Sequence, residues 1–222
     1  MVEKGFLKLT DYREYPVDVM KKRSSEFYEE MKRRRTVRHF SDQLIPRSII
    51  EDFLYTASTA PSGANQQSWS FVVVSDLTVK RQIREAAEKI ERKFYTGKAT
   101  QNWVEDLKHL DTDYNKPFLE TAPYLIVIFS QLYSFLPDGG KKKHYYVLES
   151  IGIATGMLIT AIHHAGLVAL TYTPNKMRFL NKILSRPSNE KPFMILVVGY
   201  PSEDAVVPAI GKKSLDDIAT FI

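Results

Sequence analysis

The 222-residue chain contains no cysteine. This absence excludes disulfide bonds, thiolate nucleophiles and cysteine-ligated zinc or iron–sulfur sites, and it leaves the redox compartment open. An oxidoreductase without cysteine would draw its redox chemistry from a bound cofactor. The five histidines are scattered, and no pair of them has zinc-ligand spacing beside a third ligand, so we expect no metal site.

Long apolar runs and targeting signals are also scarce. The first residues lack the apolar segment of a signal peptide, and apolar stretches such as 124–129 are too short to cross a bilayer. The hydrophobic share of 44% and the charged share of 26% are ordinary for a soluble globular protein. We therefore expect a cytoplasmic protein with no membrane partner. One domain (1–222) would carry an N-terminal arm (1–15) and a C-terminal arm (about 203–222).

Several motifs of common enzyme classes are missing as well. There is no Gly-x-Gly-x-x-Gly sequence and no Walker loop, so neither a Rossmann dinucleotide site nor a P-loop is supported. Ser62 stands outside a Gly-x-Ser-x-Gly elbow and has no evident histidine partner. A serine hydrolase is therefore disfavoured.

Positive charge is what the chain has in excess. The formal net charge of +5 favours an anionic partner, such as nucleic acid or a phosphorylated cofactor. The densest basic stretch, 32–38, contains Arg34, Arg35 and Arg38, whose guanidinium groups match phosphate oxygens bidentately. A solvated helix end is the plainer interpretation of this stretch. Nucleic-acid binding is disfavoured because no stacking aromatics or reader motif accompany it.

Apolar periodicity predicts alternating helices and strands. We expect helices over about 16–33, 46–57, 78–95, 103–110, 145–165 and 176–184, strands over 71–74, 124–130, 167–173 and 192–200, and an exposed turn over 139–143. This order is typical of a layered α+β or α/β domain. The stretch 145–165 is apolar nearly all round, which predicts a central buried helix. The N-terminal helix and the C-terminal arm would be under-packed in a monomer, which favours a dimer that exchanges arms.

Two places combine small or hydroxyl-bearing residues. In the loop 61–64, Gly63 would let backbone N–H groups approach a ligand closely. At a strand end, Thr171 and Thr173 lie two residues apart and therefore share a face. Taken alone, the loop is more simply a plain connection, and threonine is also simply a good strand former.

A third group combines charges with a phenol. Glu91 and Tyr95 lie four residues apart on one helix face, and Lys116 follows in the polar stretch 96–121, whose length is typical of a lid. A carboxylate, a phenol and an ammonium brought together would recognise the charged ends of an amino acid. Without further context, an ordinary surface residue is the plainer interpretation of each.

Motifs that are unremarkable one by one form a set along most of the chain. They are Arg34-Arg35-Thr36-Val37-Arg38-His39-Phe40, Thr59-Ala60-Pro61-Ser62-Gly63-Ala64, Trp69-Ser70-Phe71-Val72-Val73-Val74, Trp103-Val104-Glu105-Asp106-Leu107-Lys108, Thr171-Tyr172-Thr173-Pro174 and Val198-Gly199-Tyr200-Pro201-Ser202. Over residues 30–218 the set resembles the nitroreductase superfamily and, within it, the iodotyrosine deiodinase family.

The resemblance implies an α+β homodimer with a central mixed sheet flanked by helices, exchanged arms and two FMN molecules in the dimer interface. Thr173 would be the catalytic hydroxyl at flavin N5. The implied cofactor-binding residues are Arg34, Arg35, Thr36, Arg38, Pro61, Ser62, Gly63, Thr171, Tyr172, Thr173 and Lys212, with Lys213 competing for the last position.

For the substrate, the resemblance implies a phenolate held by the N–H of Ala64, an ammonium held by Glu91, and a carboxylate held by Tyr95 and Lys116. The function expected is FMN-dependent reductive dehalogenation of halotyrosines to tyrosine and halide, with an external NAD(P)H-linked reductant. The alternatives are a general nitro or quinone reductase on the same scaffold, a basic nucleic-acid-binding protein and a flavin-sequestering protein.

Overall fold

The computed structural model describes residues 5–97, 105, 107, 110 and 112–222. The chain forms two compact units, Met1–Arg34 and Arg35–Ile222. The first unit contains α1 (Val17–Lys32), which confirms the helix predicted over 16–33. None of the residues in α1 is buried.

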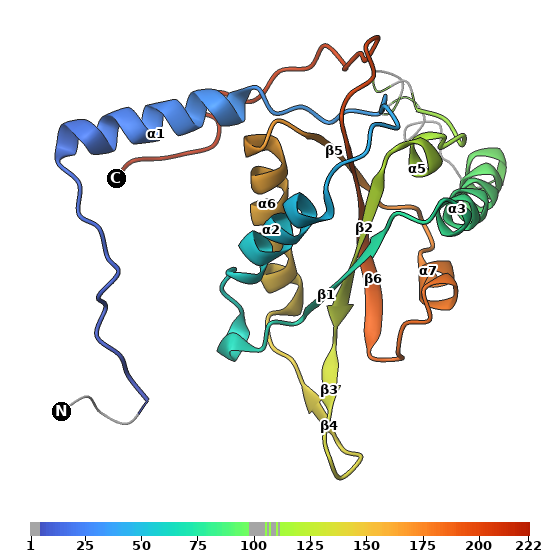
Figure 1. Cartoon of the computed structure of the whole chain (residues 1–222), viewed down its shortest axis with the longest axis horizontal. Helices are drawn as coiled ribbons and strands as arrows, with labels where there is room; N and C mark the ends of the chain where they lie inside the picture. The colour runs from blue at the N-terminus through green and yellow to red at the C-terminus, as the bar shows by residue number, and fades with distance from the viewer. Residues whose placement is uncertain (1–4, 98–104, 106, 108–109, 111) are drawn as a thin grey trace. The chain divides into compact units, whose positions relative to one another are not determined.

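The second unit is built on a four-stranded sheet (Figure 1). Its strands, in spatial order, are β1 (Trp69–Val74), β2 (Tyr124–Gln131), β6 (Glu190–Gly199) and β5 (Val168–Tyr172). Neighbouring strands pair antiparallel, while an isolated bridge from Thr36 to Ala169 adds a parallel contact at the β5 edge. The four strands predicted from the sequence are all present, and the parallel bridge at the β5 edge gives an otherwise antiparallel sheet its mixed character.

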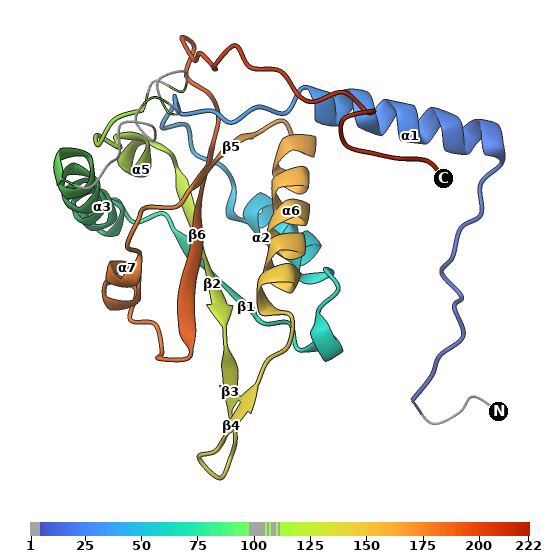
Figure 2. The same cartoon turned by 180° about the vertical axis from the view of Figure 1, so that it is seen from behind.

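Helices cover both faces of the sheet (Figures 1 and 2). Two pack on one face, α2 (Arg47–Ser58) and α6 (Val147–His164), and three on the other, α3 (Leu77–Gly97), α5 (Phe118–Thr121) and α7 (Arg178–Ile183). Alternation along β2 supplies both cores, because successive strand residues point to opposite faces. Leu125 and Val127 pack toward α3 and α7, while Ile126 and Ile128 pack toward α2 and α6. This three-layer arrangement confirms the α+β expectation.

Helix α6 differs from its prediction. Its residues Ile151, Leu158 and Ile162 are buried, but Leu148 is 64% exposed and Ile153 46% exposed. One chain offers packing partners to only one side of this all-round apolar helix. The expectation that no apolar stretch is long enough to cross a membrane was wrong for α6. By length and composition alone, α6 is long and apolar enough to do so. The core helix of a soluble protein can have the same length and composition, and α6 packs on α2 and the sheet.

A small hairpin replaces the turn predicted over 139–143. Strand β3 (Tyr133–Phe135) pairs antiparallel with β4 (Lys141–Lys143), so the turn is confined to the residues between them. The buried His144 fixes the base of the hairpin, because its Nε2 lies 2.6 Å from the hydroxyl of Ser134. The helix predicted near 103–110 falls mostly outside the described residues.

Candidate active site

A cavity of about 590 Å³ opens beside α3, the end of β5 and the segment that precedes α5. Residues that are far apart in the sequence line it. Those singled out by the sequence are Arg38, Glu91, Tyr95, Lys116, Thr171, Tyr172 and Thr173. The cavity therefore brings together a cation from the basic stretch, the carboxylate–phenol–ammonium group and the hydroxyl-bearing strand end.

Glu91 and Lys116 are the two buried charges of the cavity, only 8% and 3% exposed. Burial raises the pKa of Glu91, and the Lys116 ammonium and the backbone N–H of Asn175 offset part of this rise. Burial also lowers the pKa of Lys116, against the opposing effects of Glu91 and Asp113. Both side chains are thus held in the low-dielectric interior, where a charged ligand would be bound strongly.

The ammonium of Lys116 lies between two aromatic rings. Its Nζ is 6.0 Å from the ring centre of Tyr95 and 5.8 Å from that of Tyr172, within the range of cation–π attraction. The same Nζ donates to Thr112 Oγ1 at 3.1 Å and to the carbonyl of Asp113. Tyr95 donates its hydroxyl to the carbonyl of Thr112 at 3.3 Å. The segment 112–116 thereby closes on itself around the lysine.

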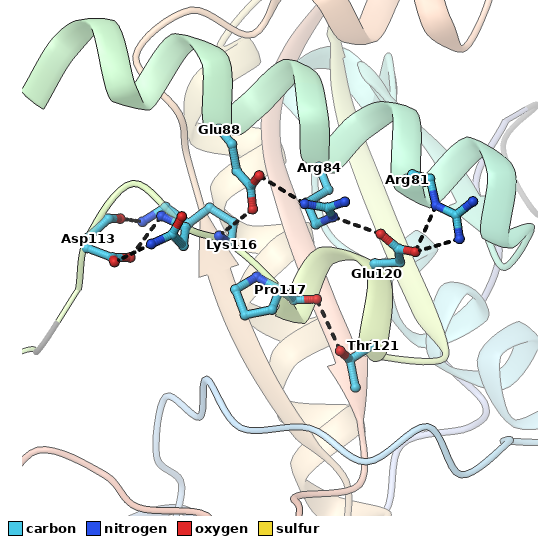
Figure 3. A network of polar contacts seen from close by, with 9 residues as sticks. Arg81, Arg84, Glu88, Asp113, Lys116, Pro117, Glu120 and Thr121 are labelled. Atoms are coloured by element: carbon cyan, nitrogen blue, oxygen red, sulfur yellow. Dashed lines mark hydrogen bonds and ion pairs between the residues drawn. The ribbon is translucent and has the colours of Figure 1, made fainter.

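A chain of ion pairs connects the backbone of Lys116 to the surface of α3 (Figure 3). The N–H of Lys116 donates to Glu88 at 2.8 Å, and Arg84 donates to the other oxygen of Glu88 at 2.9 Å. Arg84 also reaches Glu120 at 2.7 Å, and Glu120 accepts from Arg81 at 3.0 Å. The sequence did not predict this network. The i,i+4 spacing of Arg84 and Glu88 was a visible signal, but nothing local links them to Glu120.

Arg38 is the cation of the basic stretch that lines the cavity. Burial alone lowers its pKa, so no carboxylate of the described residues compensates its charge. Thr36 bridges to Ala169 on β5, and this pairing sets the position of Arg38 beside the strand end. Arg35 instead donates to the carbonyl of Pro208 and so ties the C-terminal arm to the start of this unit. Arg34 belongs to the first unit.

The loop at 61–64 leads into a short 3-10 helix, Gly63–Asn65, beside the N-terminal end of α6, and its backbone is left-handed at Ala64. The N–H of Gly63 donates to Ser150 Oγ at 3.2 Å, and Ser62 Oγ accepts from the N–H of Gln67 at 2.9 Å. A Cβ at Gly63 would lie 2.6 Å from the carbonyl oxygen of Tyr145, so only glycine fits there. Three residues that are not glycine, Ala64, Asn65 and Gln67, have φ of 50°, 52° and 47°. Each such residue costs about 1–3 kcal/mol, and strained backbone of this kind clusters at ligand sites.

Within one chain, the predicted site residues form two separate groups. The cavity group lies on the α3 side of the sheet, whereas the loop 61–64 lies on the α6 side (Figures 1 and 2). None of Pro61, Ser62, Gly63 and Ala64 lines the cavity among the described residues. Lys212 and Lys213 are exposed in the C-terminal arm and do not line it either.

A family model for the nitroreductase family matches residues 31–200. The chain belongs to the nitroreductase family. Several curated nitroreductase-family relatives are similar over most of their length. The iodotyrosine deiodinase of Haliscomenobacter hydrossis is 55% identical over 200 residues, which are 90% of this chain and 90% of that protein. The iodotyrosine deiodinase 1 of Homo sapiens is 46% identical, over 95% of this chain and 73% of the human protein.

Solved structures agree on the nitroreductase fold. A crystal structure of oxidised iodotyrosine deiodinase bound to FMN and 3-iodo-L-tyrosine superposes with a TM-score of 0.76 at 33% identity. It covers 88% of this chain and all of that one. A nitroreductase with bound FMN from Bacteroides fragilis superposes with a TM-score of 0.62 at 20% identity, over 89% of this chain and 98% of that one. At 20% identity, the similarity to the Bacteroides fragilis structure supports the fold only.

Proposed function

We propose that this chain catalyses the FMN-dependent reductive dehalogenation of halotyrosines. The observation that carries the proposal is the shared cavity, in which Glu91, Tyr95 and Lys116 can take an amino acid's charged ends beside Arg38 and Thr173. The resemblance in sequence to iodotyrosine deiodinases over nearly the whole chain supports the same substrate class. General nitroreductases need no such zwitterion-binding set.

The chemistry of the donor set fits FMN. Arg38 is a half-buried guanidinium without a carboxylate partner among the described residues, which suits a phosphate oxygen. Thr171 and Thr173 are exposed residues that line the same cavity, and the hydroxyl of Thr173 would donate to flavin N5. The other proposed contacts are Arg34, Arg35, Thr36, Pro61, Ser62, Gly63, Tyr172 and Lys212. FMN, when bound, supplies two electrons to the substrate.

The protein's own residues hold and orient the halotyrosine. Glu91 accepts from the substrate ammonium, Lys116 and Tyr95 bind its carboxylate, and the N–H of Ala64 donates to the phenolate oxygen. A buried site strengthens these charge-assisted bonds because water is excluded. In the overall step the carbon–halogen bond breaks, the ring carbon takes a proton and two electrons, and the halogen leaves as halide. Tyrosine is the organic product.

A homodimer would unite the two groups of site residues. Loop 61–64 and the cavity lie on opposite sides of the sheet in one chain, so the loop of a second copy is needed to face the cavity. The exposed apolar residues of α6, including Leu148 and Ile153, offer a surface for that copy. Exchanged N- and C-terminal arms and two FMN molecules in the interface complete the proposed assembly.

The surroundings of the enzyme belong to the proposal as well. We place it in the cytoplasm, with an external NAD(P)H-linked reductant that regenerates reduced FMN. Residues 1–222 would form one FMN-binding domain, with arms at 1–15 and 203–222.

The proposal is tested by the colour and turnover of the purified protein. We expect a yellow protein with a flavin spectrum that, once reduced without oxygen, converts 3-iodotyrosine to tyrosine and releases one iodide per tyrosine. A flavoprotein that leaves 3-iodotyrosine intact but reduces nitroarenes or quinones would establish the general reductase instead. A colourless protein that binds no FMN would reject both.

A further inference from the structure

Tyr172, the last residue of β5, differs in burial from the two threonines that flank it in the sequence. Thr171 and Thr173 are exposed, whereas Tyr172 is only 9% exposed and packs on the α3 side of the sheet. Its ring meets that of Phe118 edge-on, with 5.7 Å between ring centres. Side chains of successive residues in an extended chain alternate between faces, so this phenol and the two threonine hydroxyls leave the backbone on opposite sides, although all three residues line the cavity.

The hydroxyl of Tyr172 is buried without a hydrogen-bond partner among the described residues. Burying an unpaired hydroxyl is unfavourable, and nearly all such groups in proteins are satisfied by the chain, by water or by a ligand. Tyr172 lines the cavity that holds Glu91 and Lys116. Its free hydroxyl therefore stands where a bound ligand can satisfy it.

The protonation of this phenol makes it a donor. Burial raises the pKa of Tyr172, and the nearby carboxylates of Glu91 and Glu88 raise it further. The phenol thus keeps its proton at all physiological pH values. A neutral phenol beside an ammonium group offers an anion a second donor.

The donors around Lys116 are mostly committed within the chain. An ammonium has three N–H donors, and Lys116 directs them to Thr112 Oγ1 and the carbonyl of Asp113 as well as toward the cavity. The hydroxyl of Tyr95 has one proton and donates it to the carbonyl of Thr112, so Tyr95 must give up that bond before it donates to a ligand carboxylate. A ligand carboxylate has two oxygens that accept several hydrogen bonds, so Lys116 alone leaves it under-satisfied.

We propose that the hydroxyl of Tyr172 donates a hydrogen bond to the substrate carboxylate beside Lys116 and so helps to select amino acids over simple phenols. This inference rests on the proposed function. It moves the phenol of Tyr172 from the flavin side of the site to the substrate side, while Thr171 and Thr173 keep their flavin roles.

The test is Tyr172→Phe, which removes the hydroxyl and keeps the ring. Calorimetric titration of the FMN-loaded protein uses three ligands: 3-iodotyrosine, its analogue without the amino group and its analogue without the carboxylate. We expect the variant to bind the first two about 10- to 100-fold more weakly and the third as tightly as the unaltered protein. Tyr124→Phe, outside this cavity, is the matched control and should change none of the three.

Each other result overturns the inference. Equal weakening for all three ligands would assign the hydroxyl to the ring or to packing, and a loss of FMN would return it to the flavin. Since the hydroxyl has no partner among the described residues, the variant should melt no lower than the unaltered protein. Unfolding of the variant would therefore also contradict the proposal. If the unaltered protein binds no halotyrosine, the proposed function fails and this inference fails with it.

Discussion

At the scale of the residue, the cavity depends on two charged side chains, Glu91 and Lys116, whose burial is unfavourable for their charged forms. Glu91 and Lys116 were singled out by the sequence because the four-residue spacing of Glu91 and Tyr95 and the nearby lysine suit a zwitterion. What the sequence could not give is their burial, because that depends on the sheet and on Phe118 packing around them. Burial raises the pKa of Glu91 and lowers that of Lys116, so each charge is lost closer to neutrality than in an ordinary side chain of its type.

The first prediction concerns the acid side of substrate binding. Glu91 binds the substrate ammonium only as a carboxylate, which exists above its pKa. Because burial raises that pKa, affinity for 3-iodotyrosine should fall, as the pH drops, earlier than an ordinary glutamate with a pKa of 4.5 would cause. The dissociation constant for 3-iodotyrosine, measured over a series of pH values, shows where this fall in affinity begins.

Two controls isolate Glu91 in that measurement. For the analogue without the amino group, and for Glu91→Gln, the loss of affinity that follows the titration of Glu91 should disappear, which leaves only the loss caused by protonation of the ligand's phenolate. Glu91→Gln should also bind 3-iodotyrosine more weakly by about 2–5 kcal/mol. An unchanged affinity in Glu91→Gln would refute the assignment.

At the scale of the element, helix α3 and the loop 61–64 carry the site. The periodicity of apolar residues predicted α3 to within a few residues, and Gly63 marked the loop as a place of close approach. The ion-pair network on α3 could not be predicted from the sequence, because Glu120 lies 36 residues from Arg84 and only the packing of α5 on α3 brings them together. The β3–β4 hairpin was missed because three consecutive lysines favour an exposed turn over a strand.

A second prediction follows from the network. Glu88→Gln keeps an acceptor for the N–H of Lys116 but removes the ion pair with Arg84. We expect KM for 3-iodotyrosine to rise about 3- to 10-fold with kcat nearly unchanged, because Lys116 is displaced rather than removed. Glu85→Gln on the exposed face of α3 is the control. A fall in kcat with constant KM would contradict a positioning role.

A third prediction concerns Gly63. Gly63→Ala places a methyl group 2.6 Å from the carbonyl oxygen of Tyr145, and the loop or the start of α6 must shift. We expect a loss of about 1–3 kcal/mol in unfolding free energy, together with weaker FMN retention. Thermal unfolding and the flavin content of the purified protein give the two readouts. Gly97→Ala, which meets nothing within 4 Å, should leave the flavin content unchanged.

At the scale of the whole molecule, α6 decides whether the two groups of site residues can meet. The sequence predicted a helix buried all round, and the chain by itself buries one side. The prediction treated every apolar position as core because a sequence does not distinguish packing within a chain from packing between chains. The remaining apolar surface is the physical argument for a second copy.

The fourth prediction tests that argument. Ile153→Lys places a charge on the exposed apolar side of α6 and should convert a dimer into a monomer, since burying an unpaired ammonium in an interface is strongly unfavourable. Light scattering after size-exclusion chromatography measures the mass, and the monomer should have lost its FMN. Leu77→Lys, at a comparably exposed apolar residue on α3, should stay dimeric. A monomer that keeps full FMN content would rule out a shared site.

The left-handed backbone at Ala64, Asn65 and Gln67 sets a limit on how far this protein can be made heat-resistant. Glycine at any of the three would relax the turn and could raise the melting temperature, yet a looser turn would aim the Ala64 amide less sharply. Among glycine variants at these three positions, we therefore expect a higher melting temperature to accompany a lower kcat.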